Sequence, residues 1–378
     1  MHSPKPITMR VAIIHDWLNG MRGGEKVLEA LLELFPDAPV FTLFYERGKL
    51  SPAIEQRKIV TSWLDRIPGI YRHYRNLLPL FPSAVRTWSF HEYDLILSSS
   101  HAVAKGIDPG RAQHICYCHT PMRYIWDAAD DYHMSPARRA AFSVFRSGLQ
   151  RWDRESSQSV HHFIANSKFV SRRIETYYGR PSEVIYPPID TRFFTPTPGT
   201  ARADFYLAAG ALTPYKRFDR TIQAFNTSGK KLVVAGDGPE LRRLRSIAAS
   251  NVDMRGWVSN ENLRQLYRTA KAMVYMGRED FGMVAVEAQA CGCPVIAYDE
   301  GGMTEIVDDG VNGLLFPMQD EVSLLQAIER FESQTWPLAQ VCSKVENFSR
   351  DSFQTKIKSF IKRSTTEKSA QPGSLQPA

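Results

Sequence analysis

The feature that most constrains the fold of this chain is a pattern of short β-branched runs, each followed by residues at helical spacing. The pattern begins at Arg10–His15, where an apolar run leads through a loop into the helical repeat Glu25–Phe35. It starts again at Phe205–Ala209, which is followed by helical spacing over Arg217–Phe225. Strands that alternate with helices in this way form parallel sheets covered by helices. The sequence therefore predicts an α/β protein with two Rossmann-like domains.

The stretch Tyr186–Thr200 separates the two series, because it is rich in proline and has no periodicity. We therefore predict an N-terminal domain over residues 10–188 and a C-terminal domain over residues 200–347. Residues 348–365 are expected to form a helix that packs back on the N-terminal domain. The polar residues 366–378 are expected to be a disordered tail.

The chain of 378 residues carries 47 lysines and arginines against 40 acidic residues, a formal net charge of +7. Such a modest basic surplus suits an anionic partner, which could be a nucleotide, a phosphorylated lipid, a membrane surface or a nucleic acid. A nucleic-acid partner is disfavoured, because the sequence contains no recognisable module that binds one.

The five cysteines are an odd and small number for a disulfide framework, which favours a reducing compartment. The first nine residues are polar, and the long apolar run of a signal peptide does not follow them. No stretch has the apolar length of a membrane-spanning helix. We therefore expect a soluble, cytoplasmic protein.

The strongest chemical signal is the segment Gly277–Gly292, in which seven residues separate Glu279 from Glu287. Glu287 stands within an otherwise apolar helical run, where an unpaired carboxylate would be costly to bury. Sugar hydroxyls are suitable partners for it, and the free N–H groups of the helix start near Gly282–Val284 would attract a phosphate. The segment therefore favours a ligand that carries both sugar hydroxyls and a phosphate. The alternative is that Glu279 is a loop carboxylate and Glu287 a solvated helix residue.

This segment, with Phe281-Gly282 between its glutamates and CGCPVI at 291–296 after them, closely resembles the E-x7-E segment of retaining family 4 glycosyltransferases of GT-B fold. The resemblance extends over nearly the whole chain through five shorter segments: Gly23-Gly24-Glu25, His119-Thr120-Pro121, Pro214-Tyr215-Lys216-Arg217, Gly236-Asp237-Gly238-Pro239, and Gly301-Gly302 with Glu305. It implies two Rossmann-like domains whose parallel sheets face an interdomain cleft.

The resemblance also implies roles for single residues, with Glu279, His119 and Lys216 as the catalytic set. Glu279 would hydrogen-bond the donor sugar, and His119 would contact the sugar or its β-phosphate. Glu287 would hold the ribose, while Lys216 and Arg217 would neutralise the diphosphate. Backbone N–H groups of two further segments would bind the same diphosphate. One segment is Gly23 and Gly24, and the other is Phe281, Gly282, Met283 and Val284.

The chemistry of the leaving group explains this choice of residues. Negative charge develops on the nucleoside diphosphate as the glycosidic bond breaks, so a lysine and a helix N-terminus directed at it stabilise the transition state more than the ground state. These groups can replace a divalent metal, and the resemblance likewise implies a reaction without metal or other cofactor. Retention would follow if the acceptor attacks on the face that the leaving group occupies.

One position departs from the family pattern. The family usually has an arginine five residues before the lysine, and here that position is Ala211. Either Arg217 or another basic residue compensates, or the protein binds a sugar or nucleotide without transferring it. A Rossmann oxidoreductase is a third alternative, although Gly236-x-Gly238 lacks the third glycine of a dinucleotide fingerprint. A zinc site at Cys116-x-Cys118 and Cys291-x-Cys293 is disfavoured, because one residue between paired cysteines is too few.

The segments around Lys216 and at the N-terminus most resemble mannosyltransferase-like members of the family. GDP-mannose is therefore the favoured donor and a UDP-sugar the alternative, with a glycan or lipid-linked acceptor in surface polysaccharide assembly. Trp63–Phe90 and Arg138–Arg154 both mix arginines with aromatic residues. They predict either peripheral association with an anionic membrane or ordinary amphipathic helices that pack on the N-terminal domain.

Overall fold

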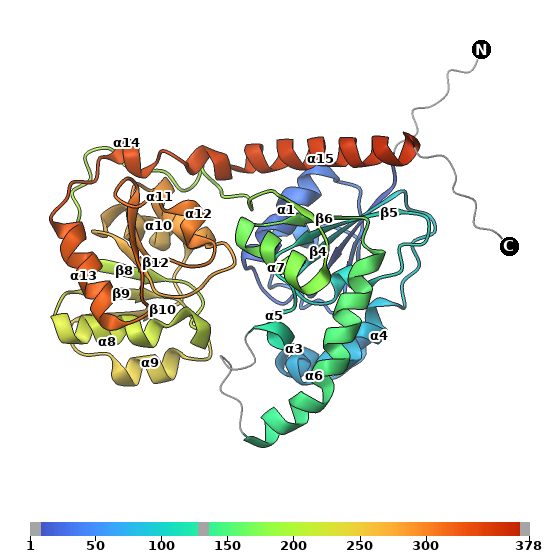
Figure 1. The fold of residues 1–378 in the computed structure, drawn as a ribbon, viewed down its shortest axis with the longest axis horizontal. Helices are drawn as coiled ribbons and strands as arrows, with labels where there is room; N and C mark the ends of the chain where they lie inside the picture. The colour runs from blue at the N-terminus through green and yellow to red at the C-terminus, as the bar shows by residue number, and fades with distance from the viewer. Residues whose placement is uncertain (1–8, 128–135, 371–378) are drawn as a thin grey trace, which may run out of the picture.

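The computed structural model describes residues 9–127 and 136–370, which form two α/β domains side by side (Figure 1). A seven-stranded sheet of order β3-β2-β1-β4-β5-β6-β7 builds the N-terminal domain, and a six-stranded sheet of order β10-β9-β8-β11-β12-β13 builds the C-terminal domain. Every strand pair in both sheets is parallel. The predicted architecture of two Rossmann-like domains is confirmed.

The strands of the first sheet are β1 (Val11–His15), β2 (Val40–Thr42), β3 (Ile59–Thr61), β4 (Leu95–Ser100), β5 (Gln113–Cys118), β6 (His162–Ala165) and β7 (Ser182–Val184). Those of the second are β8 (Tyr206–Ala209), β9 (Leu232–Ala235), β10 (Val252–Gly256), β11 (Met273–Tyr275), β12 (Val295–Tyr298) and β13 (Gly313–Phe316).

The longer helices are α1 (Gly23–Leu34), α6 (Pro136–Ser156), α7 (Lys168–Tyr178), α8 (Phe218–Ser228), α9 (Leu241–Ile247), α10 (Asn260–Thr269), α11 (Met283–Ala290), α13 (Glu321–Glu332) and α15 (Arg350–Ala370). The short ones are α2 (Pro52–Glu55), α3 (Ile70–His73), α4 (Phe81–Val85), α5 (Arg123–Trp126), α12 (Met303–Ile306) and α14 (Leu338–Val341).

Each sheet is buried on both faces, as its continuous apolar strands require. Successive side chains of a strand point to opposite faces of the sheet. In β1, Val11 and Ile13 are therefore buried in one hydrophobic core, and Ala12 and Ile14 in another. The first pair packs with α1 and α15, and the second packs with residues 64–90 and α5. Both faces of the central strands are therefore covered.

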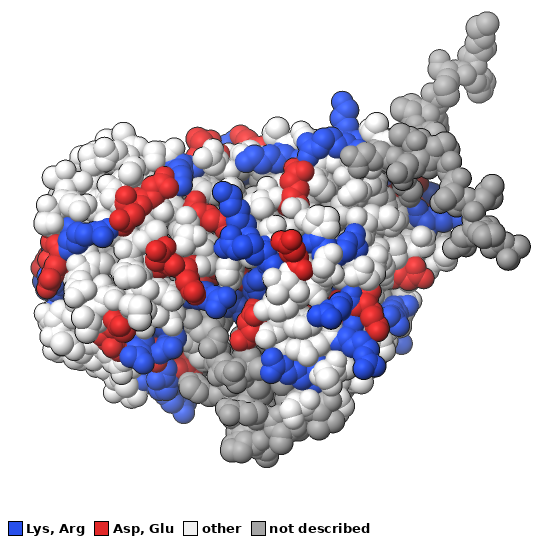
Figure 2. Space-filling view, in the orientation of Figure 1, with Lys and Arg blue, Asp and Glu red and all other residues white. Residues whose placement is uncertain are grey.

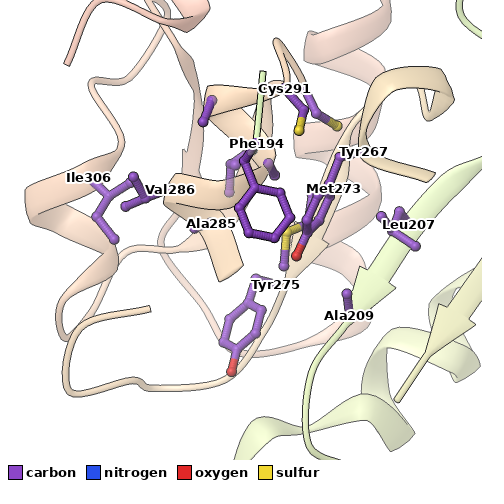
Figure 3. Packing of buried hydrophobic residues seen from close by; sticks show 14 of the residues in the cluster. Phe194, Leu207, Ala209, Tyr267, Met273, Tyr275, Ala285, Val286, Cys291 and Ile306 are labelled. Carbon is purple, nitrogen blue, oxygen red and sulfur yellow. The ribbon is translucent and has the colours of Figure 1, made fainter. Parts of the chain in front are cut away.

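The proline-rich segment between the domains is packed rather than free. Ile189 and Phe194 are buried in the core of the C-terminal domain, and Figure 3 shows Phe194 against Tyr267 and Met273. The backbone N–H of Ile189 donates to the carbonyl of Phe348 at 2.8 Å, in the second segment that connects the domains. The two connections therefore run side by side.

After the second connection, α15 returns to the N-terminal domain and lies along it (Figure 1). Its apolar residues Phe353, Ile357, Phe360 and Ile361 are buried in the core that also contains α1. The helix continues through residues 366–370, where the sequence predicts a disordered tail. No glycine or proline stops it before Pro372, and residues 371–378 lie outside the described part of the chain.

The aromatic residues of the segment Trp63–Phe90 point mostly inward. Tyr74, Phe81 and Phe90 are buried, whereas Trp63 and Leu80 keep about two fifths of their surface exposed, at 38% and 40%. For this segment, packing on the N-terminal domain accounts for the mixture of arginines and aromatic residues. In the other such segment, Arg138–Arg154, the side chains of Arg138, Arg139 and Phe142 lie outside the described residues.

In residues 9–127 and 136–370, no helix combines the length and apolar character needed to cross a bilayer.

Protonation of His114 should couple the stability of the N-terminal domain to pH. His114 is fully buried in β5, with its Nε2 2.8 Å from the hydroxyl of Ser98. Burial, with smaller contributions from His161 and Lys105, lowers the pKa of His114 to about 3. The unfolded chain then takes up a proton first, so the stability contribution is present above about pH 6.5 and is lost as the pH falls.

We therefore expect this histidine to cost about 1 kcal/mol of unfolding free energy per pH unit below about pH 6. Urea titrations at about pH 7.5, 6.5 and 5.5 measure it, with His114→Asn as the comparison. The variant should have a shallower dependence on pH below 6.5. The same slope in both proteins would contradict the assignment.

Candidate functional site

The predicted site residues follow strands that end at the junction of the two domains. In parallel α/β sheets the loops at the carboxyl ends of the strands meet and form the site. Here Gly23 begins α1 after β1, and His119 directly follows β5. On the other side, Lys216 ends the short turn Pro214–Lys216 after β8, and Glu279 follows β11.

Lys216 and Glu279 form an ion pair in the C-terminal domain. The lysine Nζ lies 2.8 Å from Oε1 of Glu279, and the side chains are 11% and 14% exposed. The hydroxyl of Tyr275 donates to the same carboxylate oxygen. Burial alone would raise the pKa of Glu279, but Lys216 and Arg123 together lower it. Glu279 therefore stays ionised beside a charged lysine.

A close approach of two backbones holds the loop that carries Glu279. The N–H of Gly302 donates to the carbonyl of Glu279 at 2.8 Å. A Cβ at Gly302 would lie 2.3 Å from Cα of Phe281, so no larger residue fits without moving the loop. The Gly301-Gly302 motif is thus a support for the Glu279 loop.

The N-termini of two helices meet across the domain junction. A Cβ at Gly23, the first residue of α1, would lie 2.9 Å from Sδ of Met283, the first residue of α11. A Cβ at Gly24 would lie 3.3 Å from the ring of His15 and 3.7 Å from that of His119. Free N–H groups and helix dipoles from both domains therefore favour an anion at this point.

His119 belongs to a buried chain of polar groups in the N-terminal domain. The hydroxyl of Ser99 lies 2.8 Å from Nε2 of His119 and 3.0 Å from Nδ1 of His15. His15 in turn faces Glu25, with 3.6 Å between Nε2 and the carboxylate. Burial, reinforced by His101 and His15, lowers the pKa of His119 to about 3. The imidazole is therefore neutral, with its ring orientation fixed by Ser99.

Glu287 is buried in α11, and its charge is matched from the other domain. Nζ of Lys26 in α1 lies 2.7 Å from Oε1 of Glu287. The carboxylate is only 3% exposed, and the hydroxyl of Tyr267 is 3.4 Å from its second oxygen. The prediction that this carboxylate has a partner is correct, and the partner within the chain is a lysine that the motif analysis did not select.

Asp280 carries the densest set of contacts between the domains. Arg123 and Arg173 of the N-terminal domain approach its two carboxylate oxygens at 2.7 and 2.6 Å, and Ser167 donates to its backbone carbonyl at 2.6 Å. Burial would raise the pKa of Asp280, but the two arginines hold it below its usual value. The guanidinium of Arg123 also lies over the ring of Tyr215, at 4.4 Å from the centroid.

A second carboxylate of the C-terminal domain caps a helix of the first. The N–H groups of Lys168 and Phe169, at the start of α7, donate to Glu305 at 2.8 and 2.9 Å. These N–H groups have no partner within the helix, so Glu305 satisfies them and its charge meets the positive end of the helix dipole.

Two further predicted residues have defined neighbours within the chain. Arg217 adopts a left-handed backbone with φ 55° at the start of α8, and its Nε lies 3.5 Å from Asp219. Phe281, predicted to act through its backbone N–H, packs its ring on Tyr186 and Phe348, with centroids 5.6 and 5.5 Å apart. The remaining predicted residues, including Gly282 and Val284 beside Met283 at the start of α11, surround the junction.

Motif analysis missed Lys26, Arg123, Arg173 and Asp280. Lys26 and Asp280 are direct neighbours of predicted residues, which is the signal that could have found them. Within the described residues, no group of three or more histidine, cysteine, aspartate and glutamate side chains is arranged to hold a metal ion. The described cysteines are free thiols, and four of the five are buried.

Two families of known proteins match the chain. The family described as Glycosyltransferase Family 4 matches residues 21–193, and the family described as Glycosyl transferases group 1 matches residues 197–351. The two matches correspond to the two domains. The chain is therefore a GT-B protein similar to the glycosyltransferases of family 4.

Curated relatives match part of the chain. An uncharacterized glycosyltransferase of Methanocaldococcus jannaschii is 31% identical over 157 residues, covering 40% of this chain and 44% of that protein. A D-inositol 3-phosphate glycosyltransferase of Streptomyces bingchenggensis is 29% identical over 210 residues, or 46% of each chain. The chain thus spans less than half the length of these relatives.

Solved structures match nearly the whole chain in fold. Anabaena HepE in complex with UDP has a TM-score of 0.71 at 20% identity and covers 94% of this chain and 100% of that one. Sucrose-phosphate synthase from Thermosynechococcus elongatus has a TM-score of 0.72 at 18% identity and covers 95% and 100%. At these identities the likeness establishes the GT-B fold.

The Asp280 contacts predict a large effect on stability. Asp280→Asn keeps the shape of the side chain but removes the charge that Arg123 and Arg173 share. Because a buried charged cluster is left unbalanced, we expect the free energy of unfolding to fall by about 3 kcal/mol. Urea denaturation measures the change.

Asp253→Asn is the matched control, because Asp253 pairs with Arg255 where both side chains are about half exposed, at 54% and 47%. That change should cost less than about 1 kcal/mol. If Asp280→Asn cost no more than the control, the contacts between the domains would not have the role described.

Proposed function

We propose that this protein is a retaining glycosyltransferase that moves a hexose from a nucleoside-diphosphate sugar to a glycan or lipid-linked acceptor. The observation that carries the proposal is the Lys216–Glu279 ion pair of one domain beside two opposed helix N-termini, one from each domain. A diphosphate and a sugar need this combination of cation, backbone N–H groups and ionised carboxylate.

The proposed reaction uses these groups directly. The bond between C1 of the sugar and the β-phosphate oxygen breaks, the acceptor oxygen bonds to C1 on the same face, and the acceptor proton passes to the departing phosphate oxygen. Lys216 and the starts of α1 and α11 would stabilise the charge that develops on the phosphate. Glu279 would accept hydrogen bonds from the sugar, and neutral His119 would donate or accept one. Neither a metal nor another cofactor is required by this scheme.

We further propose that Arg123 supplies the positive charge that is missing at Ala211. Arg123 comes from the opposite domain, lies over Tyr215 next to Lys216, and contributes to the low pKa of Glu279. Both arginines also pair with an aspartate, Arg123 with Asp280 at 2.7 Å and Arg217 with Asp219 at 3.5 Å, and the position of Arg123 over Tyr215 favours it for this role. If Arg123 takes the place of the missing arginine, the site has the charge that transfer requires. This supports a glycosyltransferase rather than a protein that only binds a sugar or nucleotide.

The donor and acceptor follow from resemblance and not from the site itself. GDP-mannose remains the favoured donor because of the mannosyltransferase-like segments, and Glu287 remains the proposed ribose ligand. A UDP-sugar is the specific alternative, since the similar Anabaena HepE is solved with UDP and with UDP-glucose. A phosphorylated inositol is a further acceptor class, suggested by relatives of that activity.

Loss of either member of the ion pair should remove turnover. We expect Lys216→Ala and Glu279→Ala to lower kcat by about 10²-fold or more, because each would remove about 3 kcal/mol of transition-state stabilisation. Release of nucleoside diphosphate from the donor, in water and with acceptor, is the measurement. Slow release in water by the unaltered protein would also exclude the alternative of an inactive binding protein.

Lys230→Ala serves as the control, because Lys230 pairs with Glu332 on the surface at 2.7 Å with both side chains about one third exposed. That variant should keep the activity of the unaltered protein. Near-normal activity in both Lys216→Ala and Glu279→Ala would refute the site.

We also propose peripheral association with an anionic membrane through the exposed side of α6. Phe145 is 53% exposed on this helix, and Arg151, six residues further along, is exposed as well. A helix that exposes both an aromatic residue and a cation is typical of a surface that binds an acidic lipid layer. Trp152 of α6 and most aromatic residues of the segment 63–90 pack on the core of the N-terminal domain, so the proposed surface is confined to this helix.

Sedimentation with vesicles of phosphatidylserine and phosphatidylcholine measures the association. Binding is expected at low salt, with severalfold weakening at high salt and in Phe145→Ser. No co-sedimentation at low salt would overturn the membrane proposal and leave the transferase proposal untouched.

A further inference from the structure

A basic pocket lies between the domains, beside the two connecting segments. It has a volume of about 360 Å³ and is lined by Lys168, Arg172, Tyr186, Thr304, Glu305, Lys344, Asn347, Phe348 and Lys356. The first two residues belong to α7 of the N-terminal domain, whereas Thr304 and Glu305 belong to α12 of the C-terminal domain. None of the predicted catalytic residues lines it.

The charges of this pocket are not balanced. Its carboxylate, Glu305, is held by the N–H groups at the start of α7, and Lys344 is paired with Asp308 at 2.6 Å. In the described part of the chain, no hydrogen bond or ion pair engages the charged ends of Lys168, Arg172 or Lys356. Figure 2 shows lysine and arginine side chains gathered over the junction of the domains.

Three unpaired cations that converge on one cavity repel one another, and an anion relieves that repulsion. Arg172 stands one helical turn from Lys168, so both side chains lie on the same side of α7. Lys356 reaches the pocket from α15, a helix distant in sequence. The fold therefore brings positive charge together from separate elements, as a site for phosphate requires.

The rest of the lining adds neutral and aromatic groups. Thr304 and Asn347 offer hydrogen-bond donors, and the rings of Tyr186 and Phe348 form one wall with 5.1 Å between their centroids. The volume exceeds that of a phosphate ion several times over. We propose that this pocket binds a small molecule that carries a phosphate group on a ring, such as a sugar phosphate, with the phosphate on Lys168, Arg172 and Lys356.

The position of the pocket gives such a ligand a defined effect. It would touch both domains and both connecting segments, and so would favour the arrangement in which the domains meet. Phe281 packs on Tyr186 and Phe348 from the side of the Glu279 loop, so the pocket wall is also the support of that loop. Binding in the pocket and the geometry of the candidate donor site are therefore coupled through one aromatic cluster.

Isothermal titration of the full chain with glucose 6-phosphate and with inorganic phosphate, at constant ionic strength, tests the proposal. We expect glucose 6-phosphate to bind more tightly than inorganic phosphate. Arg172→Glu with Lys356→Glu should weaken its binding by more than about tenfold, since two charge-assisted contacts become repulsive. Lys168→Glu alone is a milder second variant.

Two controls separate this pocket from other cationic sites. Lys358→Glu with Lys362→Glu makes the same change in net charge at exposed positions of the same helix, and should leave the affinity within about twofold. Lys216→Ala should also bind glucose 6-phosphate normally, because Lys216 belongs to the candidate donor site. Titration of Lys216→Ala therefore tests the pocket whether or not the proposed transferase activity is correct.

Several results would overturn the proposal. These are no binding to the unaltered protein, equal affinity for inorganic phosphate, equal weakening in the Lys358 and Lys362 control, or binding that is lost in Lys216→Ala and kept in Arg172→Glu with Lys356→Glu. Thermal unfolding of each variant establishes that it is folded before titration.

Discussion

The candidate site depends on carboxylates of one domain that pair with cations of the other. Asp280 is held by Arg123 and Arg173, and Glu287 by Lys26. A largely buried carboxylate is costly without a partner, so the contacts between the domains stabilise both the loop that carries Asp280 and the helix α11 that carries Glu287. The same contacts align the starts of α1 and α11, which are too far apart in sequence to meet by any local rule. The site is therefore a property of the junction and not of either domain.

The ion pair of Lys216 and Glu279 lies among these contacts between the domains. Its lysine lies at the end of a short turn and its glutamate on a loop that Gly302 supports by direct backbone contact. Arg123 reaches the same pair from the other domain and lowers the pKa of Glu279. A site assembled in this way places positive charge and N–H groups where a leaving diphosphate would gain charge, which is the physical basis of the proposed transfer reaction. The basic pocket at the connecting segments lies behind it, joined through Phe281.

Much of the fold was predictable, because the alternation of strands and helices is a local property of the sequence. Strands as short as β2 and β3, with three residues each, give little periodic signal in the sequence. For the candidate site, Glu279, Lys216, His119 and the glycine loops could be selected from the sequence, because they stand in segments that resemble family motifs, and the structure places them in loops and helix starts at the domain junction. Lys26 was not, because it is a common residue whose partner is 261 positions away. The inward packing of Tyr74, Phe81 and Phe90 could not be predicted either, since a mixture of arginines and aromatic residues fits a helix face that binds a membrane as well as one that packs on the domain.

We propose that this junction transfers a sugar from a nucleotide with retention of configuration. Proton NMR of the anomeric signals, recorded while the protein is incubated in turn with GDP-mannose, UDP-glucose and ADP-glucose, is the measurement that tests this transfer. We expect that the α-anomeric signal of one nucleotide family decreases, that the nucleoside diphosphate appears with it, and that the first product formed has the α configuration. Intact donors after prolonged incubation, or a first product of β configuration, would contradict it.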